Sequence, residues 1–337
     1  MAHELDMSNG RANMAFVGQT PWHGLGSELQ PDSPLEVWQK EAGMDWHLKS
    51  SPVQYVNEVF GARGEEDHSA SRIQTFPEKR VLYRSDTGAG LAVVSDKYQV
   101  VQPEEVLDFY RDLIMSGGFA MSTAGVLFGG KKFWALAEIG KSARIKGQDE
   151  LNGYLLLSTA CDGSMATVAQ FTSVRVVCNN TLRLAVQGKY STRPRLSIPH
   201  STIFDGAKVK AELGLASSSW DKFIEEVNVL ADRKLTRAEE VQWLIDVFGD
   251  PTLSIEDQPA AGAKLMKVIH GLYMGEGKGS DLVSSRGTLW GLVNATTEFY
   301  DFHTGHRTND GRFDKAQFGE TAAMKQKAWD SAMLMAA

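Results

Sequence analysis

The spacing of apolar residues changes near residue 205, from strand-like runs to a helical period. Before that point, β-rich runs are separated by the turn sequences Asp86-Thr87-Gly88, Gly129-Gly130 and Asp162-Gly163-Ser164, which predict three β-hairpins. Pro103 opens a helical pattern between the first and second hairpins. The first part of the chain is therefore expected to form an antiparallel sheet with a packed helix.

Helical spacing dominates the rest of the chain. Thr236-Arg237-Ala238-Glu239 has the form of a capping box, so a helix is expected to begin there. Similar patterns run over residues 219–233, 260–274, 288–302 and 313–335. Strands followed by helices predict an α+β fold, in which an antiparallel sheet core built from hairpins with packed helices precedes a mainly helical C-terminal region.

The same patterns divide the chain into three parts. Residues 1–75 are rich in Gly, Pro and isolated tryptophans, and they are interpreted as an N-terminal arm or subdomain with a short helix near 34–42. Residues 76–204 are predicted to form a basic antiparallel α+β core, and residues 205–337 the mainly helical region.

The stretch FTSVRVVCNNTLRLAV, residues 171–186, places an arginine inside an apolar run. On a strand, Val174 and Val176 share one face, which is expected to be the core face, and Arg175 lies on the other. Arg175 is then free to contact a phosphate. The alternative is an ion pair between Arg175 and a structural acid such as Asp162.

Residues after this strand are predicted to form a short helix that begins near Thr181 and ends at Gly188. Asn179 or Asn180 is suited to cap it, because asparagine is a preferred N-cap residue. A helix N-terminus next to Arg175 would offer free N–H groups and a positive dipole end to an anion.

Composition narrows the class of protein. The chain has 337 residues, of which 42% are hydrophobic and 23% charged, as in ordinary globular proteins. There are two cysteines without a CxxC pair, no apolar run long enough to span a membrane, and no signal-peptide pattern at the N-terminus. These features predict a cytoplasmic protein that does not contact membranes.

Charge is unevenly distributed along the chain. The net charge of −7 argues against a protein that coats nucleic acid through its overall charge. Residues 119–199 nevertheless carry ten basic and four acidic side chains, a net charge of +6, which leaves −13 on the remainder. A basic middle between acidic flanks is compatible with a solvated sheet face and also with a phosphate-binding surface.

Basic residues interleaved with aromatic ones are the combination that sequence-tolerant single-strand binding requires. The residues expected to bind nucleic acid, with Trp134 and Tyr190 as the stacking candidates, are Lys131, Lys132, Trp134, Arg175, Asn180, Thr181, Arg183, Lys189, Tyr190, Arg193 and Arg195. The alternative for Trp134 is a core position, since Phe133 or Trp134 must face the core in any sheet.

Signals for catalysis are weak. The sequence MGEGKGS, residues 274–280, lacks the first glycine and the final Ser/Thr of a phosphate loop, so no nucleotide hydrolysis and no cofactor are expected. His23, Cys178 and the metal-ligand candidates Asp301, His303 and His306 leave an enzymatic function open, although a packed turn, a core thiol and solvated or structural histidines are the preferred explanations.

Six ordered motifs carry a resemblance to a known family. They are AFVGQTPWHGLG, YQVVQPEEVLDFY, STAGVLFGGKKFWALAEI, YLLLSTACDGSMA, TSVRVVCNNTLRLA and GTLWGLVNATTEFYDF. Together they resemble the phage/plasmid-like proteins known as domain of unknown function 932. The resemblance runs over nearly the whole chain and implies an origin in a bacteriophage, prophage or plasmid, where DNA handling is a common class of function.

The basic sheet is also similar in outline to phage single-strand annealing proteins of the Red-beta/RecT type. The leading hypothesis is therefore a non-enzymatic homo-oligomer that binds single-stranded DNA, promotes annealing in recombination or replication, and works with host or phage recombination proteins. The alternative is an interaction protein that regulates or neutralises a host factor through its acidic flanks.

Overall fold

The computed structural model describes residues 5–7, 10–18, 25–57, 72–116, 118–175, 180–183, 195–213, 217–304 and 320–337. The strands are β1 (Met14–Phe16), β2 (Ser27–Glu28), β3 (Leu48–Asn57), β4 (Arg72–Arg84), β5 (Gly90–Ser95), β6 (Ala120–Leu127), β7 (Lys132–Ile145), β8 (Asp149–Ala160), β9 (Thr167–Arg175), β10 (Asn180–Arg183) and β11 (Arg195–Ile198). The helices are α1 (Leu35–Glu41), α2 (Pro103–Met115), η2 (Phe128–Gly130), α3 (Gly206–Leu213), α4 (Ser217–Asp232), α5 (Arg237–Phe248), α6 (Ala260–Gly271), η4 (Leu272–Glu276), α7 (Leu289–Glu298), η5 (Phe299–His303) and α9 (Glu320–Ala336). The predicted α+β class is confirmed.

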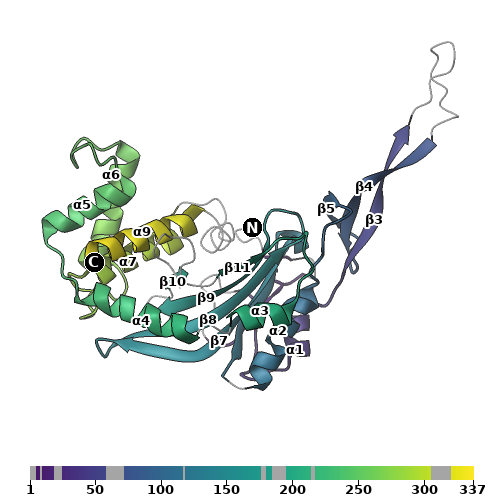
Figure 1. Cartoon of the computed structure of the whole chain (residues 1–337), viewed down its shortest axis with the longest axis horizontal. Helices are drawn as coiled ribbons and strands as arrows, with labels where there is room; N and C mark the ends of the chain where they lie inside the picture. The colour runs from purple at the N-terminus through teal and green to yellow at the C-terminus, as the bar shows by residue number, and fades with distance from the viewer. Residues whose placement is uncertain are drawn as a thin grey trace, which may run out of the picture.

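An eight-stranded sheet forms the centre of the molecule (Figure 1). Its order is β10-β9-β8-β7-β6-β1-β2, and β11 also pairs with β9. The two predicted hairpins β6–β7 and β8–β9 are present, and β7 also pairs antiparallel with β8. Gly129, in the turn between β6 and β7, has a φ of +68°, a conformation that glycine adopts without strain.

Helix α2 packs against the sheet. Pro103 is its first residue, and Gln102 and Glu105 form a capping box at its N-terminus. Tyr110 is completely buried, and its hydroxyl donates to main-chain oxygens of the sheet, 2.8 Å from that of Ala135 and 3.0 Å from that of Leu155. This contact fixes α2 on the sheet, and it satisfies a polar group that would be costly to bury alone.

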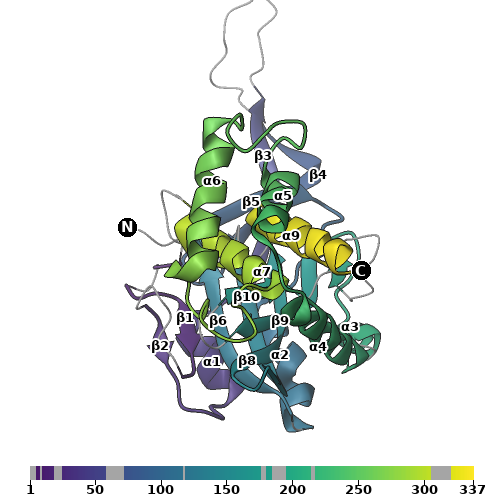
Figure 2. The same ribbon diagram turned by 90° about the vertical axis from the view of Figure 1, so that its left-hand side faces the viewer.

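The C-terminal helices gather at the end of the main sheet where β10 lies, and α7 and α9 contact that strand (Figure 2). The predicted capping box is present in α5, where Thr236 and Glu239 bond reciprocally. Trp329 on α9 packs on Phe223 of α4 and Trp290 of α7, with ring centroids 5.4 and 6.3 Å apart. The helical spacing of apolar residues in this region places such side chains on the helix faces that pack together.

One contiguous hydrophobic cluster extends from the strands of the main sheet into the C-terminal helices. A buried carboxylate, Asp149 at the start of β8, accepts hydrogen bonds from Ser284 Oγ at 2.7 Å and from Trp290 Nε1 at 2.9 Å. The sheet and the helices therefore share a core and a polar contact. The division at residues 75 and 204 remains a prediction about folding units.

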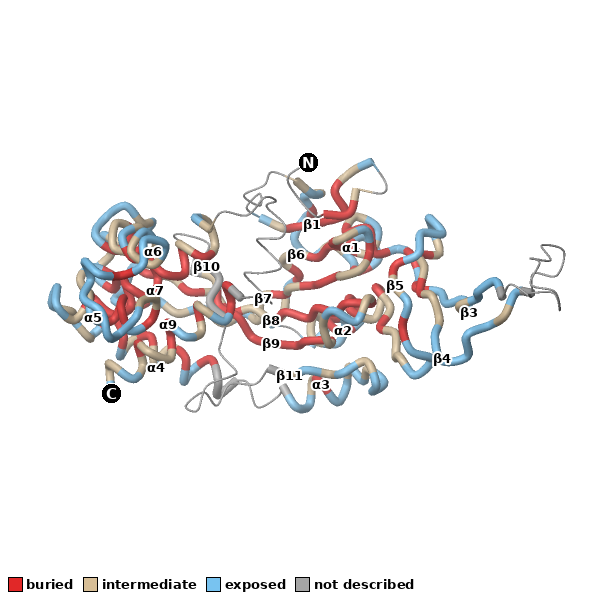
Figure 3. The backbone as a smooth tube through the Cα atoms, turned by 90° about the horizontal axis from the view of Figure 1, so that it is seen from above, coloured by how far each residue is buried: buried red, intermediate tan, exposed pale blue. Residues whose placement is uncertain are grey.

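A second, three-stranded sheet has the order β3-β4-β5 and contains the predicted hairpin β4–β5. Strands β3 and β4 extend beyond β5 as a two-stranded ribbon, because residues 53–57 pair only with residues 72–76. The ribbon projects from the body at the end opposite the C-terminal helices (Figure 1). Most of it is exposed to solvent (Figure 3).

Candidate nucleic-acid interface

The most basic part of the chain contains no acidic residue at all. Residues 163–204, which we call the acid-free segment, include no Asp or Glu; their Lys and Arg residues are Arg175, Arg183, Lys189, Arg193 and Arg195. This segment supplies strands β9, β10 and β11. The segment therefore has a sequence charge of +5, in a chain whose net charge is −7.

Strand β9 receives two partners along the same edge. Residues 180–183 of β10 pair with residues 172–175, and residues 195–198 of β11 pair with residues 167–170. Arg183 is thus opposite Thr172 and Arg195 opposite Gln170. Positions directly opposite share a face of the sheet, so the register places Arg183 and Arg195 on the same face, two β9 positions apart.

This face of β9 carries two buried polar residues. Gln170 and Thr172 are both 1% exposed, and Val168 and Val174 flank them on the same face. The Nε2 group of Gln170 has no hydrogen-bond partner among the described residues. A buried polar group without a partner is uncommon in a core, and this one is at the register position opposite Arg195.

The predicted helix after β9 is wrong. Asn180, Thr181 and Arg183 belong to strand β10, so Asn180 does not cap a helix that begins at Thr181, and the described residues that pair with the end of β9 form a strand. The physical reason is tertiary: pairing with β9 satisfies backbone N–H and C=O groups along an edge that would otherwise be unpaired. The anion site expected from a helix dipole is therefore replaced by a strand edge.

The face of β9 that was expected to lie opposite the core is also buried. Ser173, on the same face as Arg175, is completely buried, and on the predicted core face Val168 is buried and Val174 partly buried. Both faces of this strand are covered, so alternation in the sequence does not identify a solvent face. Asp162 is excluded as the ion-pair partner of Arg175, because it precedes the strand that Arg175 ends, and nine-residue β9 spans about 26 Å.

Trp134 is a core residue and does not serve as a surface stacking platform. It is 3% exposed and packs with Met14, Leu127 and Leu156. Gly125 lies beneath its indole, where an added Cβ would come within 2.5 Å of the ring. Trp134 and the three residues it packs with belong to a second apolar cluster, separate from the main core. Trp134 and Leu136, at even positions of β7, both face this cluster, and this explains why the tryptophan is buried.

The two lysines at the start of β7 are partly buried. Lys131 follows the η2 turn, and its carbonyl oxygen accepts a hydrogen bond from the Cys161 N–H at 2.8 Å. Lys132 Nζ lies 5.3 Å from the centroid of the Phe128 ring. Lys132 pairs with Ala160, four β7 positions from the level of Gln170, so these lysines lie at the other end of the sheet from Arg175.

Several predicted residues lie outside the described part of the chain. They are His23, Cys178, Lys189, Tyr190, Arg193 and His306. Lys189, Tyr190 and Arg193 fall between β10 and β11 in the sequence, and both of those strands pair with β9.

The C-terminal end of the acid-free segment is firmly held. His200 stacks on Tyr98 with ring centroids 4.4 Å apart, and its ring nitrogens lie within hydrogen-bond distance of the main-chain oxygens of Gln99 and Met165, at 2.9 and 3.2 Å. The Tyr98 hydroxyl donates to the Ala160 carbonyl at 2.8 Å. These contacts fix the chain immediately after β11, and so fix the position of β11 on the sheet edge.

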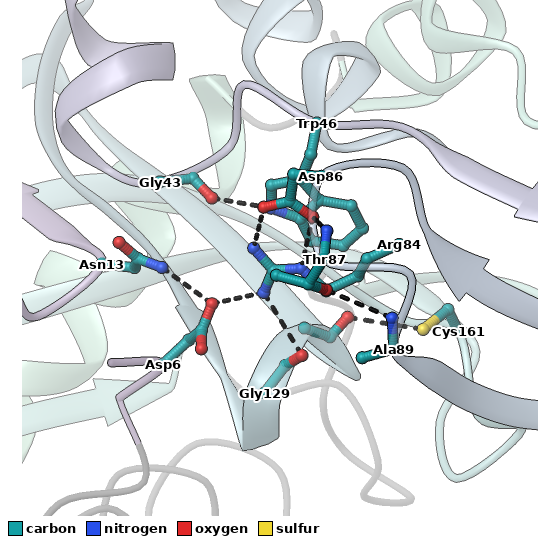
Figure 4. A network of polar contacts seen from close by, with 11 residues as sticks. Asp6, Asn13, Gly43, Trp46, Arg84, Asp86, Thr87, Ala89, Gly129 and Cys161 are labelled. Atoms are coloured by element: carbon teal, nitrogen blue, oxygen red, sulfur yellow. Dashed lines mark hydrogen bonds and ion pairs between the residues drawn. The ribbon is translucent and has the colours of Figure 1, made fainter. Parts of the chain in front are cut away.

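A buried ionic cluster joins the small sheet to the main sheet (Figure 4). Arg84, at the end of β4, is 1% exposed; it bonds to Asp6 and, at 2.7 and 2.9 Å, to the Asp86 carboxylate. Its guanidinium lies 4.3 Å from the Trp46 ring centroid, and it donates to the Gly129 carbonyl at 3.3 Å. Hydrogen bonding to Arg84 lowers the pKa of Asp86.

A buried thiol lies beside this cluster (Figure 4). Burial raises the pKa of the Cys161 thiol to about 12, so it remains protonated at neutral pH. Asp301, a metal-ligand candidate from the sequence, lies in η5 and forms a buried ion pair with Lys325 of α9 at 2.6 Å. Among the described residues, no group of three or more His, Cys, Asp or Glu side chains is arranged to hold a metal ion.

Exposed aromatic residues were missed by the sequence analysis, which did not assign strands to residues 48–57 and 72–76. Tyr55 and Phe76 on the ribbon are 51% and 41% exposed. The signal was present: two β-rich runs flank the polar loop at residues 61–71, a pattern typical of a hairpin.

No helix in the described part of the chain is long and apolar enough to cross a membrane.

Comparisons with known proteins identify a family for this chain. Neither the curated proteins nor the solved structures contain a match to this chain. A family model described as "Domain of unknown function (DUF932)" matches residues 90–324, from β5 into α9, and includes the acid-free segment. Because the match covers more than half of the sequence, the chain belongs to the DUF932 family.

Proposed function

We propose that the protein is a non-enzymatic, homo-oligomeric DNA-handling protein that binds single-stranded DNA and promotes annealing during recombination or replication of a phage or plasmid. The observation that carries this proposal is the acid-free segment, whose five basic residues lie in, or between, strands that pair along β9. A local cationic region in an acidic protein attracts a polyanion to one place and not to the whole surface.

Arg183 and Arg195 are the central phosphate contacts in this proposal, because their register positions share a face and neighbour each other along β9. Arg175 is at the strand end and on the opposite face, so it contributes less. Lys189, Tyr190 and Arg193, between the two strands in sequence, supply further charge and one aromatic ring.

The proposal is tested with Arg183→Ala/Arg195→Ala, compared with Arg144→Ala as a matched control. Arg144 is also a strand arginine, but it lies outside the acid-free segment and is ion-paired with Glu150 at 3.3 Å. Fluorescence anisotropy with a labelled oligothymidylate should show weakened binding for the double variant, with a salt slope reduced by about 1.4, and unchanged binding for the control.

An annealing assay with complementary oligonucleotides provides the second readout. The wild type should accelerate annealing, and the double variant should lose most of that acceleration at equal concentration. Equal affinity and equal annealing rates for wild type and double variant would refute the proposed site. Retention of a host protein by nuclease-treated wild type, without any DNA binding, would favour the alternative of a host-factor regulator.

A further inference from the structure

The ribbon formed by β3 and β4 has one face that continues over its whole length. In the inner half, Leu48, Leu82 and Val94 face the core and are buried. The register places the remaining alternate positions on the other side. We call this side the outer ribbon face; it consists of Lys49, Ser51, Val53, Tyr55, Gln74, Phe76, Lys79, Val81, Tyr83, Val93 and Ser95.

Aromatic rings recur along this face. Tyr83 is opposite Lys49 and Phe76 is opposite Val53, four β3 positions or about 13 Å further along the ribbon. Tyr55 lies two positions, or about 7 Å, beyond Phe76 on the neighbouring strand. Tyr55 and Phe76 are 51% and 41% exposed, so their rings are available to a ligand.

The charged residues of the outer ribbon face, as defined above, are lysines. Lys49 and Lys79 are both exposed, and none of the paired positions of this face carries an acidic residue; exposed Glu78 lies beside Lys79 where the β3–β4 register shifts. A two-stranded ribbon with exposed rings that no other described element covers is only marginally stable in water, which indicates that a ligand or partner covers it. Flat rings together with positive charge match a polyanion that also presents flat apolar groups, namely single-stranded DNA.

We propose that the outer ribbon face is a second contact surface for single-stranded DNA, in which Tyr55, Phe76 and Tyr83 stack on bases and Lys49 and Lys79 contact phosphates. This inference rests on the proposed function and adds a surface that lies mostly before the region of the family match, since only Val93 and Ser95 of it fall within residues 90–324. The Arg84 cluster connects the base of the ribbon to the main sheet.

The test uses Tyr55→Ser/Phe76→Ser and a control on the opposite face of the same ribbon segment. Val56 and Ile73 are directly opposite each other and are 63% and 69% exposed, so Val56→Ser/Ile73→Ser removes a comparable exposed apolar pair. Anisotropy with labelled oligothymidylate should give a dissociation constant raised about tenfold or more for the aromatic variant and unchanged for the control.

A charge variant separates stacking from phosphate contact. Lys49→Gln/Lys79→Gln should reduce the salt slope by about 1.4, whereas the aromatic variant should leave the slope unchanged, because stacking releases no counterions. All three variants alter exposed side chains, so their thermal unfolding should match that of the wild type, and this match confirms that each variant is folded.

The outcomes distinguish the two proposals. A wild type that fails to bind single-stranded DNA at low salt overturns both the proposed function and the ribbon contact. Normal binding by the aromatic variant, with a functional wild type, overturns the ribbon contact alone. Sedimentation velocity without DNA covers the rival occupant: if the aromatic variant converts an oligomer to monomers, the ribbon contacts a second copy and the DNA contact is refuted.

Discussion

At the scale of single residues, Arg84 is a buried cation that forms ion pairs with Asp6 and Asp86. Its charge is buried between two carboxylates and over an indole, and its partners come from the N-terminal segment, the β4–β5 turn and the η2 turn. A buried ion pair adds little over an apolar substitute, but loss of one partner is costly because the other charge stays buried.

Arg84→Met should therefore lower the free energy of unfolding by about 3–5 kcal/mol, since the buried carboxylate of Asp6 loses the cation paired with it. Chemical denaturation at neutral pH measures this loss. The control is Arg84→Met/Asp6→Asn, in which part of the stability should return. A loss below about 1 kcal/mol for the single variant would contradict a structural role for the cluster.

Acid should weaken the same cluster. Hydrogen bonds from Arg84 hold the pKa of Asp86 below its ordinary value of 3.8, so this carboxylate stabilises the fold fully above its unfolded pKa. The contribution is lost as the pH falls through the lower, folded pKa. The stability difference between wild type and Asp86→Asn should thus shrink on acidification from about pH 5 to pH 2, measured by urea denaturation. A constant difference would contradict the coupling.

At the scale of elements, strands were predicted where turns and apolar runs coincide, as in the hairpins β6–β7 and β8–β9. The capping box of α5 was predicted for the same reason, because its signal is local. Strand β10 was missed because its conformation depends on pairing with β9, and the four residues Asn180–Arg183 contain no local signal for that partner.

Candidate site residues were less predictable than the fold. Register decides which of Arg175, Arg183 and Arg195 share a face, and composition contains no information on register. Because Trp134 is buried, it does not serve as a stacking residue. Tyr55 and Phe76 became candidate stacking residues only once the structure showed that they are exposed.

Trp134→Ala tests the placement of this residue on the covered face of β7. It should lower the free energy of unfolding by about 3–5 kcal/mol, because a large buried side chain leaves a cavity. The dissociation constant for single-stranded DNA, measured well below the melting temperature, should stay at the wild-type value. A stable variant with weakened binding would show instead that the ring contacts the ligand.

At the scale of the whole molecule, the two proposed DNA contacts come from different sheets of an acidic chain. Strands β10 and β11 of the acid-free segment pair with β9 in the main sheet, and the ribbon of β3 and β4 projects from the end of the molecule opposite the C-terminal helices (Figure 1). The shared core and the Arg84 cluster connect the parts that bear them. This arrangement suits a protein that holds an extended strand at more than one place and leaves its acidic surface unoccupied.

The most direct test of this account is the salt dependence of wild-type binding to single-stranded DNA. Five phosphate contacts from the acid-free segment predict that the logarithm of the association constant falls with the logarithm of salt concentration with a slope of about −3.5. Contacts from the ribbon lysines would steepen it. Binding that is undetectable at low salt, or that does not change with salt, would contradict the central claim.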